Sequence, residues 1–157
     1  YSDRIDNLVM SEPDRNMRRQ LEQKVKEAGR KNVDMAPFGA ESIDFPDESF
    51  DCVVSTLVLC SVEDQKTSLD EIYRLLRPGG TLRSIEHVVA DSDPKTLRWQ
   101  KILNPVWNFM CCNCHLTRDT ASAIEQAGFR TDRLERAMIE EAPSVVKYNL
   151  RGIAEKR

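Results

Sequence analysis

The stretch FPDESFDCVVSTLVLCSVED, residues 45–64, decides the fold class of this chain. Its acidic turn leads into a continuous apolar run from Phe50 to Thr56. Runs of this kind are typical of a strand that is covered on both faces of a parallel sheet. We therefore predict a buried strand that ends at Thr56, at an open sheet edge, and a helix over residues 63–76.

Strands and helices are predicted to alternate on both sides of this segment. The further strands are expected at 5–10, 33–38 and 81–89, and the helices at 14–28, 94–109 and 117–127. Asp14, Asp93 and Thr117 are expected to begin helices, and Pro105 to kink or split the second one. The alternation predicts an α/β fold with a doubly wound, mainly parallel sheet and helices on both faces. The last two strands, 130–139 and 145–153, have too short a connection for a crossover and should pair antiparallel.

The length and charge of the chain favour one ordinary domain over residues 1–157. The net charge of −3 argues against a nucleic-acid surface. No stretch approaches the ~20 apolar residues that span a bilayer, although an anchor upstream of Tyr1 stays an open alternative. A reducing compartment such as the cytoplasm is expected, because the five cysteines are an odd number.

The cysteine pattern raises the question of a metal. Cys111, Cys112, Cys114 and His115 lie close together, but a second ligand pair at zinc-finger spacing is absent from the sequence. We therefore predict no structural metal. Two further cysteines, Cys52 and Cys60, lie among apolar residues and are predicted to be buried in the core.

Longer motifs carry a resemblance to a known family. AESIDFPDESFDCVVSTLVLCSVED (40–64) is followed at a helix's distance by IYRLLRPGGTLRSIEH (72–87). Together they resemble the class I S-adenosylmethionine-dependent methyltransferases, and most closely the small-molecule group that includes the alkyl-thiol methyltransferases. The resemblance covers residues 5–156. It extends to three stretches in the last third of the chain: NPVW, CHLTRDTASAIEQAGF and VVKYNLRGIAEK.

The resemblance implies roles for residues at the strand ends. Glu12 would bind the ribose of S-adenosyl-L-methionine, the Ala40 backbone and Glu41 would lie against its adenine, and Thr56 and Leu57 would border its methionine part. Glu86 and His87 would face the pocket of a small-molecule methyl acceptor. His87 is the candidate catalytic base; the alternative is a histidine hydrogen-bonded at a strand end. A thiol acceptor would need little help from a base, because a thiol ionises near neutrality.

Two departures from the family pattern bear on function. Gly39 stands where many relatives carry an acid, and the glycine-rich cofactor turn with its strand is absent from this chain. In the family that strand lies between those ending at Glu12 and Thr56, so its loss would leave them ~9.6 Å apart. Three explanations are possible: the chain is a fragment of a longer enzyme, the two strands have re-paired, or another chain supplies the strand. We favour the fragment, which would be an N-terminally truncated, weakly active or inactive portion of the enzyme.

Other functions stay open at this point. They are a non-catalytic Rossmann-like interaction module and another nucleotide-binding α/β enzyme, such as a nicotinamide enzyme. Trp99, Trp107, Phe109 and Met110 are expected to pack in the core, with an apolar acceptor pocket or contact with a membrane surface as alternatives. The sequence does not indicate an oligomeric state.

Overall fold

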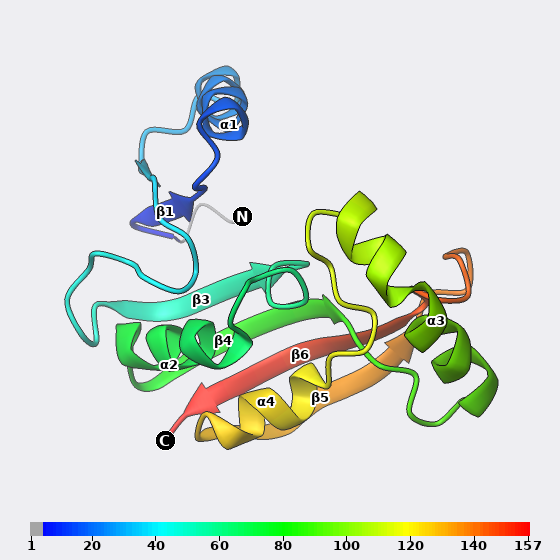
Figure 1. The fold of residues 1–157 in the computed structure, drawn as a ribbon. Helices are drawn as coiled ribbons and strands as arrows, with labels where there is room; N and C mark the ends of the chain where they lie inside the picture. Colours follow the sequence, from blue (N-terminus) through cyan, green and yellow to red (C-terminus); the bar gives the residue numbers. More distant parts are fainter. Residues whose placement is uncertain (1–4) are drawn as a thin grey trace. The chain divides into compact units, whose positions relative to one another are not determined.

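A computed structural model describes residues 5–157 and divides the chain into two compact units, Tyr1–Asp44 and Phe45–Arg157 (Figure 1). The first unit contains β1 (Leu8–Ser11), α1 (Arg15–Glu27) and β2 (Val33–Ala36), and the two strands pair in parallel. The Asp14 carboxylate accepts the backbone N–H groups of Asn16 and Met17, so the predicted helix cap is confirmed. This β-α-β unit places the end of β1 and the turn after β2 at one edge of its sheet.

The second unit contains a four-stranded sheet with the order β3-β4-β6-β5. Its strands are β3 (Phe50–Thr56), β4 (Leu76–His87), β5 (Phe129–Met138) and β6 (Tyr148–Lys156). β3 and β4 are parallel, whereas β6 is antiparallel to both β4 and β5. The antiparallel terminal pair is therefore confirmed, and the sheet as observed is mixed.

Two helices of the second unit, α2 (Gln65–Leu75) and α4 (Thr120–Gln126), lie over the same face of this sheet (Figure 1). The buried cluster beneath them includes Leu69, Ile72, Leu82, Ile124 and Phe129. α4 begins at Thr120 with Asp119 as its cap, and not at Thr117 as predicted, because the Asp119 carboxylate accepts the Ser122 N–H group.

β3 is covered differently from the prediction. Ser55 is buried and Val53 packs on the core, but Cys52 and Thr56 are exposed and Val54 is 47% exposed. Side chains alternate along a strand, so only one set can meet α2. The prediction that both faces of this strand are covered, and that Cys52 is a core residue, is wrong for the described residues.

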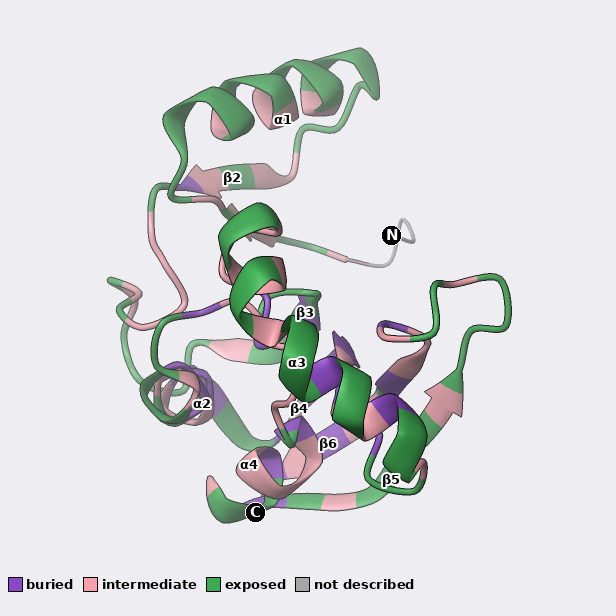
Figure 2. Cartoon of the chain, turned by 45° about the vertical axis from the view of Figure 1, so that its right-hand side comes forward, coloured by how far each residue is buried: buried purple, intermediate pink, exposed green. Residues whose placement is uncertain are grey.

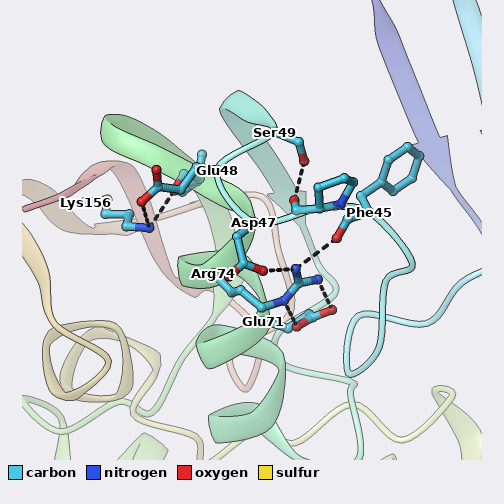
Figure 3. Close-up of polar contacts among 9 residues, drawn as sticks. Phe45, Asp47, Glu48, Ser49, Glu71, Arg74 and Lys156 are labelled. Atoms are coloured by element: carbon cyan, nitrogen blue, oxygen red, sulfur yellow. Dashed lines mark hydrogen bonds and ion pairs between the residues drawn. The ribbon is translucent and has the colours of Figure 1, made fainter.

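The acidic turn before β3 has a structural role. Figure 3 shows the Arg74 guanidinium of α2 donating to the Glu71 carboxylate, to the Asp47 carboxylate at 2.6 Å and to the Phe45 carbonyl. These two carboxylates raise the pKa of Arg74 above its ordinary value. In the same turn Glu48 pairs with Lys156 of β6 at 3.7 Å. The carboxylates thus fix the entry of β3 onto its neighbours.

Strand pairing also bears on the expected gap in the sheet. β1 pairs only with β2, and β3 pairs only with β4, within residues 5–157. Direct re-pairing of the strands that end at Glu12 and Thr56 is therefore not found in the structure.

α3 (Pro94–Met110) continues through Pro105 without being split.

The residue that caps this helix, Asp93, predicts a pH dependence of stability. Hydrogen bonds from the Thr96 hydroxyl and backbone N–H and from Tyr148 lower the pKa of the cap residue Asp93 from 3.8 to about 2. The unfolded chain binds the Asp93 proton more readily than the folded chain does. This contribution is therefore complete above the unfolded pKa, and it is lost as the pH falls from about 4 to about 2.

Urea unfolding at a series of pH values tests this prediction. Asp93→Asn keeps a capping side chain but removes the titrating charge, so its free energy of unfolding should fall less steeply over this acid range. Equal slopes for the variant and the parent chain would show that Asp93 does not contribute.

Candidate functional site

The first unit brings Glu12 to the end of β1 and Ala40 and Glu41 to the turn after β2. Glu12 is half-buried, and its Oε1 accepts the Asp14 N–H at 2.9 Å. Its other carboxylate oxygen accepts no hydrogen bond from the part of the chain that the structure describes, as a ribose-binding acid requires. The turn at Ala40 is closed by the Ser42 N–H, which donates to the Gly39 carbonyl.

Gly39 keeps the approach to this turn open. A Cβ atom at this position would lie 3.2 Å from Glu41 Oε2, so a side chain would crowd the carboxylate. Within the described residues this unit thus offers one carboxylate oxygen of Glu12 and a turn that carries no side chain at Gly39.

The second unit brings Thr56, Leu57 and His87 to the ends of adjacent strands, since Thr56 pairs with Ile85. Leu57 has a φ of 56° and donates its N–H to the Ile85 carbonyl at 2.8 Å. A non-glycine residue in the left-handed region is a strained conformation of the kind that gathers at ligand sites. Thr56 is exposed and Leu57 is 45% exposed, so both are open to a ligand.

The expectation that Glu86 faces an open acceptor pocket is wrong. Its side chain is completely buried, and its carboxylate accepts the Ser55 hydroxyl at 2.6 Å and the N–H groups of Val58 and Cys60 at 3.2 and 3.1 Å. Because these donors occupy the carboxylate, Glu86 ties the end of β4 to the loop after β3.

His87 is half-buried and its Nδ1 lies 3.5 Å from the Cys114 sulfur. Only its Nε2 atom is therefore left for a base role toward an acceptor. His115 follows on the same loop, and burial lowers its pKa. Its backbone N–H donates to the Cys60 carbonyl at 2.8 Å, so His115 helps to hold this loop to the loop after β3.

Cys60, His87 and Cys114 form a cluster that the sequence did not reveal. The sulfurs of Cys60 and Cys114 lie 3.8 Å apart, and both cysteines are buried, so the prediction for Cys60 is confirmed. The contact between the two sulfurs, together with burial, raises the pKa of Cys60, whereas the same contact and His87 lower the pKa of Cys114 to about 4. Cys114 is therefore the thiol of the pair that ionises first.

The apolar face of α3 is largely open. Phe109 is 91% and Met110 73% exposed, and Trp99 is 52% exposed, whereas Trp107 is half-buried. Figure 2 shows that much of α3 is exposed. Core packing was therefore the wrong expectation for Trp99, Phe109 and Met110. Within residues 5–157 no helix is both long and apolar enough to cross a bilayer.

These features define the class of protein. Parallel strand pairs end in polar and strained residues, and ligands of open α/β sheets bind beyond such strand ends. The antiparallel pair β5–β6 completes a Rossmann-like α/β sheet. A nucleotide-type cofactor is the class of ligand that this arrangement accommodates.

Comparison with known proteins identifies the family. Residues 1–84 match the family described as methyltransferase domain. The chain is 39% identical over 110 residues to thiol S-methyltransferase TMT1A of Homo sapiens, which covers 70% of this chain and 45% of that protein. It is 43% identical over 98 residues to TMT1B of Rattus norvegicus, covering 62% and 40%.

The fold agrees with this match. A SAM-dependent methyltransferase from Methanosarcina mazei superposes with a TM-score of 0.74 at 18% identity, over 96% of this chain and 82% of that one. The chain belongs to the class I S-adenosylmethionine-dependent methyltransferase family. It spans less than half the length of the curated relatives it matches.

Proposed function

We propose that this chain is part of an enzyme that transfers a methyl group from S-adenosyl-L-methionine to a small-molecule thiol. The observation that carries the proposal is the 39% identity over 70% of the chain to a thiol S-methyltransferase. The open strand ends at Thr56 and Leu57 support it, because they offer a ligand an accessible edge.

In this proposal the residues at the strand ends take the roles that the family resemblance implies. The free oxygen of Glu12 accepts hydrogen bonds from ribose hydroxyls, and Ala40 and Glu41 border the adenine. Thr56 and Leu57 lie along the methionine part. The cofactor supplies a methyl group already activated on a sulfonium, so these residues mainly bind and orient it.

A thiol acceptor suits the surroundings of His87. A thiol loses its proton near neutral pH, so transfer to it depends little on a strong base. His87 Nε2 is then the group that takes up the proton of a thiol that arrives protonated. The five free cysteines agree with a reducing compartment, where such a thiol would persist.

The same proposal treats the chain as a portion of a longer enzyme. It is supported by the partial span of the relatives and, within residues 5–157, by one edge of β1 and one edge of β3 that pair with no other strand. A further strand with a glycine-rich turn would add backbone N–H groups for the cofactor carboxylate. We therefore expect residues 1–157 alone to bind the cofactor poorly.

A methyl-transfer assay with the product of the complete reading frame tests this function. We expect methylation of an alkyl thiol and little methylation of a phenol or an amine of similar size. Glu12→Ala should raise the KM for S-adenosylmethionine about 10- to 100-fold, because it removes hydrogen bonds to a charged acceptor. Glu27→Ala, at an exposed position of α1, is the matched control and should leave the KM unchanged.

Two results would contradict the proposal. Methylation of the phenol or amine in preference to the thiol would show that the acceptor class is different. No transfer to any acceptor, together with no cofactor binding, would favour a non-catalytic interaction module.

A further inference from the structure

Three metal-binding side chains converge from segments that are far apart in the sequence. Cys60 lies in the loop after β3, His87 ends β4, and Cys114 lies in the loop after α3. One ligand atom from each of them lies within 4.8 Å of the others. This group is not the Cys111–His115 cluster seen in the sequence, from which only Cys114 takes part.

Two of the three distances within the group are those of a tetrahedral zinc site. With Zn–S bonds of ~2.3 Å and a Zn–N bond of ~2.0–2.1 Å, two sulfur ligands lie ~3.8 Å apart and a sulfur and a nitrogen ~3.5 Å apart. The observed separations are 3.8 Å between the two sulfurs and 3.5 Å between the Cys114 sulfur and His87 Nδ1. The ligand atoms of the third pair, Cys60 and His87, lie within 4.8 Å of each other, so an ion can bind if these two atoms approach each other slightly.

The loop that carries Cys114 is held by hydrogen bonds that do not involve the thiol. Cys112 and Asn113 have positive φ values and turn the chain back after α3. The Asn113 amide then donates to the Ser61 carbonyl at 2.9 Å, and the Asn108 amide to the Cys114 carbonyl at 2.7 Å.

Cys60 is held on the opposite side. Its N–H donates to the Glu86 carboxylate and its carbonyl accepts from His115, so its backbone is fixed at both ends. Arg118 adds hydrogen bonds to the Leu59 carbonyl at 2.8 Å and to the Val62 carbonyl at 2.6 Å. The two sulfurs thus belong to loops that are fixed to each other before any ion binds, which is the preorganisation that metal sites need.

We propose that Cys60, Cys114 and His87 bind a Zn²⁺ ion, with the fourth position open to water or to an external thiolate. Two thiolates and a neutral imidazole balance the charge of the ion, and soft sulfur ligands select zinc over magnesium or calcium. Cys60 loses its thiol proton to solvent on binding, whereas Cys114, whose pKa is lowered, binds as the thiolate, and coordination through Nδ1 places the histidine proton on Nε2. With zinc bound, His87 Nε2 already carries a proton and cannot take one from an acceptor thiol, so the base role of His87 in the proposed function applies to the metal-free chain only. The test of the zinc site measures metal binding and does not depend on the methyl acceptor.

Cobalt and zinc titrations of the metal-free chain, reduced with a phosphine, test this site. We expect one Co²⁺ per chain with thiolate-to-cobalt charge-transfer absorption, displaced by one equivalent of Zn²⁺. The variants Cys60→Ser and Cys114→Ser should each weaken binding more than a hundredfold. The matched control replaces the three other cysteines, Cys52, Cys111 and Cys112, with serine and should keep both the stoichiometry and the spectrum.

The control variant also keeps the test decisive if a ligand variant fails to fold. Loss of the cobalt spectrum in the control, or a parent chain that binds neither ion, would overturn the proposal. In the second case the three groups are only hydrogen-bonded to one another. A Cys60–Cys114 disulfide that forms in air and leaves the reduced chain unable to bind metal would equally overturn it.

Discussion

Replacing Gly152 with alanine is expected to lower the free energy of unfolding by about 2–6 kcal/mol. Gly152 lies in β6 opposite Leu134 and has a φ of 137°. A Cβ atom there would lie 2.2 Å from the Arg133 carbonyl oxygen and 3.0 Å from Leu134 Cα. Both contacts are with backbone, so relief requires that β5 move away from β6.

Gly79→Ala is the matched control for this substitution. Gly79 also has a positive φ, of 77°, but an added Cβ would meet nothing within 4 Å. Only the conformational cost of about 1–2 kcal/mol is then expected. Urea unfolding of both variants should show a clearly greater loss for Gly152→Ala, and equal losses would show that the close approach of β5 is not restrictive.

Replacing Glu86 with alanine is expected to cost about 2–4 kcal/mol. The substitution removes the only side chain that accepts the buried Cys60 N–H group, and it also frees the Val58 N–H group and the Ser55 hydroxyl. Val58 is 43% exposed, so its N–H group can reach water, and most of the loss arises at the buried Ser55 and Cys60.

Two further variants show whether the loss comes from these hydrogen bonds. Glu86→Gln keeps the shape of the side chain but turns an amide NH₂ toward a donor, so it should lose about 1–3 kcal/mol. Glu135→Ala, which removes an exposed carboxylate paired with Arg151, should change the stability by less than about 0.5 kcal/mol. A Glu86→Ala variant as stable as Glu135→Ala would contradict this account of the loop after β3.

The fold could be predicted where local sequence decides the structure. The apolar run from Phe50 to Thr56 matches β3 residue for residue, and Asp14 and Asp93 cap their helices as expected. β4 was predicted too short. It begins at Leu76, opposite Phe50, and the Arg77–Gly80 turn lies inside the strand as an irregularity of pairing.

The site was less predictable because it depends on approaches between distant segments. Glu86 and His87 are neighbours, yet one is buried among three donors and the other contacts a sulfur, since side chains alternate along a strand. Cysteines and histidines that are close together in the sequence did not predict this group. Cys60, His87 and Cys114 are far apart in the sequence and come together only where the loop after α3 meets the end of β4.

The central claim is that Glu12 and Thr56 contribute to cofactor binding, and that tight binding also needs a further strand. Calorimetric titration of S-adenosylmethionine into residues 1–157 and into the product of the complete reading frame tests this claim most directly. Residues 1–157 should bind it poorly, whereas the product of the complete reading frame should bind it with a micromolar or lower Kd. Glu12→Ala and Thr56→Ala should each weaken that binding. Micromolar binding by residues 1–157, or binding by the longer protein that neither substitution affects, would contradict the account.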